Sequence, residues 1–120
     1  MNDMLKIGVI GSRGFNDYKL LKDTLDEYLN DVFLIVSGGA VGADSLGEKW
    51  ANENSVKTLI IKPDWNKYGK SAGFIRNTNI VENSDIIIAF WDCMSRGTED
   101  SIKKAREMGR EVKIIYYNTI

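Results

Sequence analysis

Five short apolar runs, separated by polar stretches of about helical length, constrain the fold of this chain more than any other feature. Each run is rich in isoleucine, valine or aromatic residues, as β-strands are. The runs are Leu5–Ile10, Val32–Val36, Val56–Ile61, Asp85–Phe90 and Val112–Tyr116. Three of them are almost wholly apolar, which is typical of parallel strands covered on both faces. The alternation predicts a parallel sheet with right-handed crossovers and helices on both sides.

The polar stretches between the runs show helical spacing of their apolar residues, which would then share one face. These sets are Leu21, Leu25 and Tyr28; Ala43, Leu46, Gly47, Trp50 and Ala51; and Ile102, Ala105 and Met108. Gly109 is expected to end the last helix. The third connection carries turn residues from Pro63 to Gly73 before a helix expected over about Ala72–Asn83.

The predicted fold is therefore Rossmann-like, a three-layer α/β/α domain with a five-stranded parallel sheet in the strand order 3-2-1-4-5. In such a sheet the order reverses between the first and fourth strands, and ligands bind there, beyond the carboxyl ends of the strands. The loops that follow these strands are the expected site. A length of 120 residues suits one such domain, spanning 1–120.

Composition excludes several classes of site. The chain has no histidine and one cysteine, Cys93, which rules out a Ser-His-Asp triad, a Cys-His dyad, a histidine-ligated zinc and an intrachain disulfide. We expect neither a metal nor a cofactor. The net charge of −1 removes the usual argument for a protein that coats nucleic acid, although a local basic pocket is compatible with it.

The sequence shows no pattern typical of a signal peptide or a membrane-spanning helix. The start lacks the charged and apolar regions of a signal peptide. The longest apolar run, Ile86–Trp91, is far shorter than the ~20 residues that a membrane-spanning helix needs. We expect a cytoplasmic protein without a membrane partner.

The loop after the first strand reads Gly11-Ser12-Arg13-Gly14-Phe15. Glycines let the backbone approach a ligand, Ser12 offers a hydroxyl, and Arg13 offers a forked cation suited to phosphate or carboxylate. The glycine spacing is not that of a dinucleotide-binding motif. The alternative is a simple turn with a solvated arginine.

The loop after the second strand opens a helix with small residues. It contains Ser37, Gly38, Gly39, Ala40, Gly42 and Asp44. Exposed backbone N–H groups here would face an anion, helped by the helix dipole. Asp44 would cap the helix or hold a ribose hydroxyl. The alternative is that small residues only allow the helix to pack closely on the sheet.

The loop after the fourth strand runs from Trp91 to Asp100 and also precedes a helix. Ser95, Arg96, Gly97 and Thr98 supply hydroxyls, a cation and N-terminal amides, all suited to phosphate. The alternative is an ordinary N-cap, with Glu99 complementing the helix dipole.

The third connection brings Arg76 and Asn77 toward the same edge, and Trp65 or Tyr68 would either stack on a base or pack internally. Its Gly69-Lys70-Ser71 is not the end of a phosphate-binding P-loop, because Asp64 stands where that motif needs glycine.

Taken together, the motifs resemble those of a known superfamily. They are Gly11-Ser12-Arg13, Ser37-Gly38-Gly39-Ala40-x-Gly42-Ala43-Asp44, Asp64-Trp65, Ala72-Gly73-x-x-Arg76-Asn77 and Ser95-Arg96-Gly97-Thr98. This set resembles the SLOG superfamily, and within it the small single-domain YspA-like proteins of bacteria and phages. The superfamily joins the DNA-processing protein DprA with the Lonely Guy phosphoribohydrolases. The resemblance implies a Rossmann-like domain that binds nucleotides or nucleotide-derived ligands, often as a dimer.

One departure from the Lonely Guy enzymes bears on catalysis. Their motif places a glutamate three residues after the threonine, where this chain has Ser101. By the resemblance Arg76 corresponds to their arginine, and Glu99 or Asp100 would have to replace the carboxylate. No catalytic residue is assigned; Arg76, Glu99 and Asp44 are candidates only.

We therefore expect a module that binds a nucleotide or nucleotide-derived phosphorylated ligand. The expected ligand-binding residues are Gly11, Ser12, Arg13, Ser37, Gly38, Gly39, Ala40, Gly42, Asp44, Arg76, Asn77, Ser95, Arg96, Gly97 and Thr98. One alternative is a nucleoside 5′-monophosphate phosphoribohydrolase, with Asp44, Asp92, Glu99 and Asp100 as candidate carboxylates. Another, less favoured, is a DprA-like module for single-stranded nucleic acid or assembly that uses Trp50, Trp65 and Trp91. The expected partners are the small molecule and a second copy in a homodimer.

Overall fold

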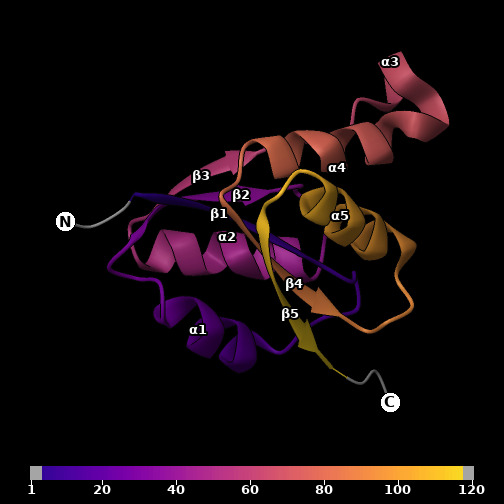
Figure 1. The fold of residues 1–120 in the computed structure, drawn as a ribbon. Coiled ribbons are helices and arrows are strands. Elements are labelled where there is room, and N and C mark those ends of the chain that lie inside the picture. The colour runs from indigo at the N-terminus through magenta and orange to yellow at the C-terminus, as the bar shows by residue number, and fades with distance from the viewer. Residues whose placement is uncertain (1–3, 118–120) are drawn as a thin grey trace.

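A computed structural model describes residues 4–117 as a five-stranded parallel sheet flanked by helices (Figure 1). The strands are β1 (Leu5–Gly11), β2 (Val32–Ser37), β3 (Lys57–Ile60), β4 (Ile86–Trp91) and β5 (Glu111–Tyr116). The helices are α1 (Tyr18–Asp26), α2 (Ala43–Glu53), α3 (Trp65–Tyr68), α4 (Ala72–Glu82) and α5 (Arg96–Glu107), with a 3-10 turn η1 (Gly69–Ser71). The strand order β3-β2-β1-β4-β5 and the all-parallel pairing confirm the predicted topology.

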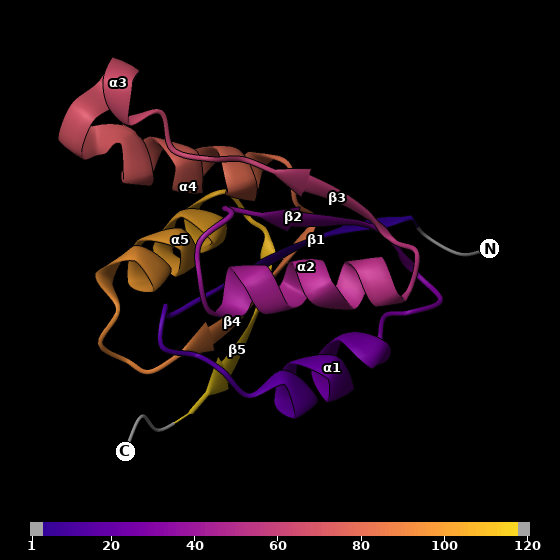
Figure 2. The ribbon, with the colours of Figure 1, turned by 180° about the vertical axis from the view of Figure 1, so that it is seen from behind.

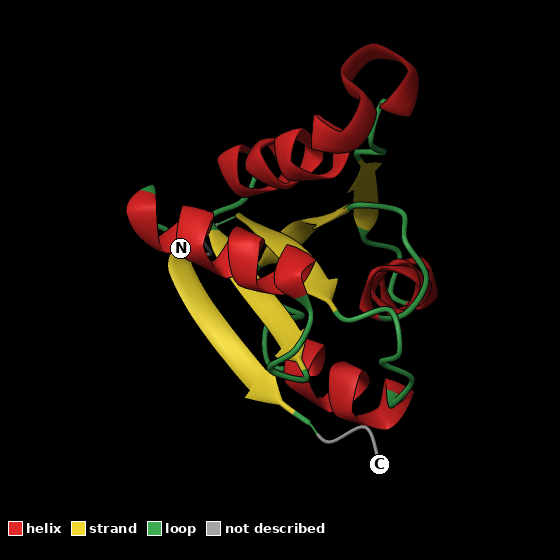
Figure 3. Ribbon diagram, turned by 90° about the vertical axis from the view of Figure 1, so that its right-hand side faces the viewer, coloured by secondary structure: helices red, strands yellow, loops and turns green. Residues whose placement is uncertain are grey.

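Helices cover the sheet on both sides, and each side has its own apolar core (Figure 3). Strand β4 shows the division: Ile88 and Phe90 join the core under α1 and α2, whereas Ile87 and Ala89 join the core under α4 and α5. Because side chains alternate along a strand, an unbroken apolar run is what a strand buried on both faces requires. None of the described helices has the length and apolar character needed to cross a lipid bilayer.

The boundaries differ from the prediction at the first helix. Helix α1 ends at Asp26, so Tyr28 lies in the turn beyond it and not on the helix. The Val32 amide donates to the Tyr28 carbonyl at 2.9 Å, which bends the chain into β2. Tyr28 still packs against the core, so its apolar contact is kept although the helix is not. Gly109 has φ +73 directly after the cap of α5 and confirms the predicted helix end.

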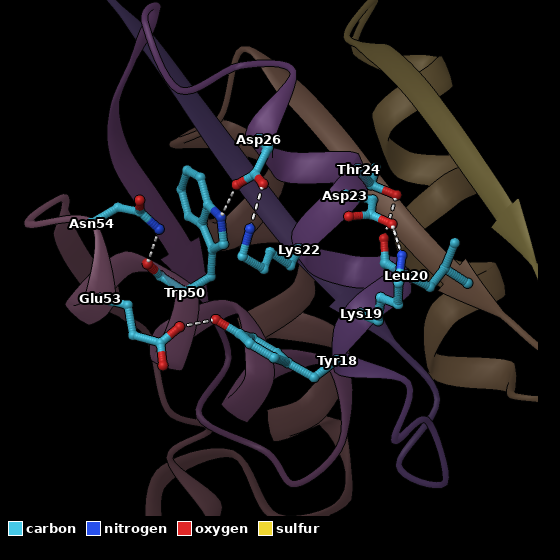
Figure 4. A network of polar contacts seen from close by, with 10 residues as sticks. All are labelled: Tyr18, Lys19, Leu20, Lys22, Asp23, Thr24, Asp26, Trp50, Glu53 and Asn54. Atoms are coloured by element: carbon cyan, nitrogen blue, oxygen red, sulfur yellow. Dashed lines mark hydrogen bonds and ion pairs between the residues drawn. The ribbon is translucent and has the colours of Figure 1, made fainter.

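A polar network holds α1 against α2 (Figure 4). Trp50 is fully buried, and its indole N–H donates to Asp26 at 2.9 Å, while Lys22 pairs with the same carboxylate at 2.8 Å. Tyr18 donates its hydroxyl to Glu53. Burial, and then this hydrogen bond, raise the pKa of Tyr18 to about 12. Trp50 is thus a core residue, and its predicted use as a nucleic-acid contact is wrong.

Candidate functional site

A cavity of about 470 Å³ opens beyond the carboxyl ends of β1 and β4, at the predicted switch point. Its size is typical of a small-molecule site. Ten of the residues expected from the sequence line it: Gly11, Ser12, Arg13, Ala40, Asp44, Arg76, Asn77, Ser95, Gly97 and Thr98. Segments remote along the chain are therefore brought together at one edge of the sheet (Figure 2).

The loop between β1 and α1 is hydrogen-bonded to the end of β4 and to the residue after it, and its arginine forms no ion pair within the described residues. The Ser12 amide donates to the Phe90 carbonyl at 3.1 Å, and the Ser12 hydroxyl accepts from the Asp92 amide at 3.4 Å. Gly11 must be glycine, because a Cβ there would lie 2.6 Å from both the Ala43 Cβ and the Phe90 carbonyl oxygen. Within residues 4–117, the exposed guanidinium of Arg13 takes part in no ion pair.

The loop between β2 and α2 differs from its predicted role. The Gly38 and Ala40 amides are not free for an external anion, because the buried side chain of Asp44 already accepts from them at 3.1 and 3.2 Å. The Gly39 amide donates to the Ser37 hydroxyl at 3.2 Å. A carboxylate carried by the first turn of α2 therefore fills the cradle that the glycine pattern predicted for phosphate.

Five of the residues predicted to contact the ligand do not line the cavity. They are Ser37, Gly38, Gly39, Gly42 and Arg96. The first four shape the β2–α2 loop, and Arg96 is exposed at the first position of α5. Glu99, a candidate catalytic residue, is exposed and also absent from the lining.

Asp44 and Arg76 form the electrostatic centre of the cavity. Burial raises the pKa of Asp44 to about 6, against the opposing effects of the Ala40 amide, the Arg76 charge and the Gly38 amide. Burial also lowers the pKa of Arg76, and the charge of Asp44 opposes that change. A carboxyl group with a pKa near neutrality in a cleft is typical of functional sites.

Arg76 and Asn77 connect the two loops on either side of the cavity. The Arg76 guanidinium donates to the Gly38 carbonyl at 2.9 Å and to the Asn77 side-chain oxygen at 3.0 Å. The Asn77 amide group then donates to the Gly97 carbonyl at 3.3 Å and to Asp100 at 3.2 Å. The pair from α4 thus holds the β2–α2 loop and the start of α5 in a fixed relation.

The start of α5 is both a capped helix and part of the cavity wall. The Ser95 hydroxyl accepts from the Thr98 amide at 3.4 Å, which is the N-cap that the alternative interpretation predicted. Asp92 accepts from the Met94 and Ser95 amides at 2.8 and 2.9 Å, and these bonds lower its pKa. The Gly97 amide has no acceptor among the described residues, as expected in the first turn of a helix.

The cavity also has an apolar floor that the motif analysis missed. Ile10 and Ile80 are buried and line it between the polar walls. Ile10 belongs to a predicted strand and Ile80 lies within a predicted helix, but nothing in the sequence motifs placed either of them at the site. Ser101 lines the cavity as well and donates to the Gly97 carbonyl at 3.2 Å.

Comparison with known sequences gives a family. A family model described as the YspA, cpYpsA-related SLOG family matches residues 5–68. The Gene 61 protein of Mycobacterium phage D29 is 30% identical over 115 residues, which cover 88% of this chain and 92% of that protein.

Solved structures share the fold. DNA processing protein A (DprA) from Streptococcus pneumoniae matches with a TM-score of 0.80 and 24% identity, over 98% of this chain and 52% of that one. DprA from Helicobacter pylori, described for its single-stranded DNA binding mode, matches with a TM-score of 0.72 and 24% identity, over 93% and 65%. The molybdenum cofactor binding protein from Rippkaea orientalis matches with a TM-score of 0.78 and 20% identity, over 96% and 78%.

This chain therefore spans about half the length of the S. pneumoniae protein. At these identities the similarity to solved structures shows only the fold. The sequence matches, in contrast, show the family. On the family model and the phage relative, the chain belongs to the YspA, cpYpsA-related SLOG family.

Proposed function

We propose that the cavity binds a nucleotide or nucleotide-derived phosphorylated ligand at the carboxyl ends of the strands. The observation that carries this proposal is that two hydrogen-bond donors without a partner among the described residues line one cavity. The Arg13 guanidinium has no ion-pair partner in the described part of the chain, and the Gly97 amide lies in the first turn of α5. Both line the same space, where a phosphate would receive charge-assisted hydrogen bonds.

The two carboxylates of the cavity lining support a ligand that also carries hydroxyl or amino groups. Asp44 and Asp92 each direct one carboxylate oxygen to backbone amides, which leaves their other oxygens to accept from a ligand. Ile10 and Ile80 add an apolar surface for a sugar or base. A nucleotide has these three kinds of surface: an anion, hydroxyl groups and a flat apolar ring.

The fold neighbours are consistent with a ligand-binding module. One is described as a single-stranded DNA-binding protein and another as a molybdenum cofactor binding protein. The hydrolase alternative lacks the glutamate of its motif, because Ser101 lines the cavity at that position and Glu99 does not line it. Two of its other candidate carboxylates, Asp44 and Asp92, do line the cavity. We therefore propose binding as the function of this site and keep nucleotide hydrolysis as the alternative.

Replacing Arg13 with alanine should weaken nucleotide binding at least tenfold, because one charge-assisted contact contributes about 1.5–3 kcal/mol. Isothermal titration calorimetry with a panel of ribonucleoside 5′-monophosphates measures this. Arg96→Ala is the matched control: it removes the same charge from a neighbouring position that does not line the cavity, and should change the affinity little. Equal losses in both variants would show that only the overall charge is sensed, and would contradict the assignment.

A further inference from the structure

The segment between β3 and α4 projects from the domain and does not line the cavity. Helix α3 and η1 stand beyond the start of α4, away from the sheet (Figures 1 and 2). Every residue from 64 to 71 is exposed, and none of them lines the cavity. We call residues 62–74 the α3 projection.

Three aromatic side chains of the α3 projection face solvent: Trp65, Tyr68 and Phe74 are 55%, 40% and 52% exposed. Grouped exposure of large apolar side chains is uncommon on a surface without a partner. Trp65 and Tyr68 stand three residues apart on one short helix, a spacing that makes side chains neighbours.

The short helix that carries Trp65 and Tyr68 is capped and hydrogen-bonded. Asp64 caps α3 by accepting from the Lys67 amide at 3.1 Å, and its carbonyl accepts from the Tyr68 amide at 3.0 Å. A Cβ on Gly73 would lie 3.7 Å from the far edge of the Trp65 indole, so that ring rests against α4 on one side. A ring held in this way is a prepared stacking surface, which costs little ordering entropy when a planar group binds.

Positive charge gathers on the same projection. It holds Lys62, Lys67 and Lys70 against a single acid, Asp64, giving +2 in a chain of net charge −1. The ion pairs found among residues 4–117 do not involve these lysines. Lys67 lies 5.1 Å from the centre of the Tyr68 ring, so cation and aromatic face the solvent together.

This combination distinguishes between kinds of partner. Protein–protein interfaces are enriched in aromatic residues but depleted in lysine. Proteins that bind single strands combine aromatic stacking platforms with a cationic path for the backbone. We propose that the α3 projection binds single-stranded nucleic acid, with unpaired bases stacked on Trp65 and Tyr68 and phosphates near Lys62, Lys67 and Lys70. The proposal concerns a surface separate from the cavity and does not depend on the function proposed there.

The test is fluorescence anisotropy of a labelled oligothymidylate of about 15 nucleotides, titrated with the full chain at several salt concentrations. Trp65→Ala should weaken binding about tenfold, whereas Trp65→Phe should keep most of it. Replacing Lys62, Lys67 and Lys70 together with alanine should reduce the slope of log affinity against log salt by about 2. The matched control replaces three exposed lysines elsewhere, Lys19, Lys49 and Lys103, and should leave that slope nearly unchanged.

Three results would overturn the proposal. The first is oligothymidylate binding that does not respond to Trp65→Ala and to the lysine replacements. The second is binding that Arg13→Ala abolishes and Trp65→Ala spares, which would place the strand in the cavity. The third is no oligothymidylate binding together with self-association, measured by sedimentation equilibrium, that Trp65→Ala removes; the projection would then contact a second copy.

Discussion

Replacing Gly42 with alanine is expected to lower the free energy of unfolding by about 2–6 kcal/mol, from overpacking and a disfavoured backbone conformation acting together. Gly42 has φ +87 and ψ −132, which side chains rarely adopt. A Cβ there would lie 2.5 Å from the Ser12 carbonyl oxygen and 2.7 Å from that of Arg13. These neighbours are backbone atoms, so no rotamer change relieves the contact.

Gly14→Ala is the matched control for this prediction. Gly14 belongs to the β1–α1 loop, which Gly42 contacts, and lines the cavity, but a Cβ on Gly14 would have no atom within 4 Å. Urea denaturation followed by tryptophan fluorescence measures both variants. We expect a lower midpoint for Gly42→Ala and almost no change for Gly14→Ala. A Gly42→Ala protein as stable as the wild type would show that the β1–α1 and β2–α2 loops do not meet as described.

The sheet was predictable because its central strands, β1 and β4, are buried on both faces. An unbroken apolar run such as Ile86–Trp91 has few alternatives in a chain of this length, and alternation with helical stretches implies parallel pairing. The strand with the least burial is the edge strand β3, whose four residues are all exposed. The segment from Pro63 to Gly73 was predicted to carry turn residues, whereas the structure has the short helix α3 there, capped by Asp64.

The candidate site was predictable to the level of the loops but not of the individual donors. Glycines after Ser37 indicated free amides, yet Asp44 occupies those amides, and only the fold brings its carboxylate there. Similarly, Arg13 and Arg96 look alike in the sequence. The chain direction after β1 places Arg13 in the cavity lining, whereas the helical phase of α5 leaves Arg96 outside it.

Asp44 should also make the stability of the protein fall as the pH rises. In the unfolded chain this carboxyl ionises near its ordinary pKa of 3.8, whereas in the folded protein burial raises that pKa to about 6. Between these values the folded state binds more protons, so raising the pH favours unfolding. The contribution of Asp44 is thus greatest below the unfolded pKa and is lost as the pH passes the folded one.

The reference variant is Asp44→Asn, which keeps an oxygen for the Gly38 and Ala40 amides but does not titrate. Between pH values of about 4 and 7, the unfolding free energy of the wild type should fall by about 2–3 kcal/mol relative to this variant. Urea denaturation of both proteins across this range measures the difference. Asp92→Asn is the informative control, because amide hydrogen bonds lower the pKa of Asp92 and its contribution has the opposite sign. Parallel curves for the wild type and Asp44→Asn would mean that the carboxylate is solvated, and that the Gly38–Ala40 amides remain available to an external anion.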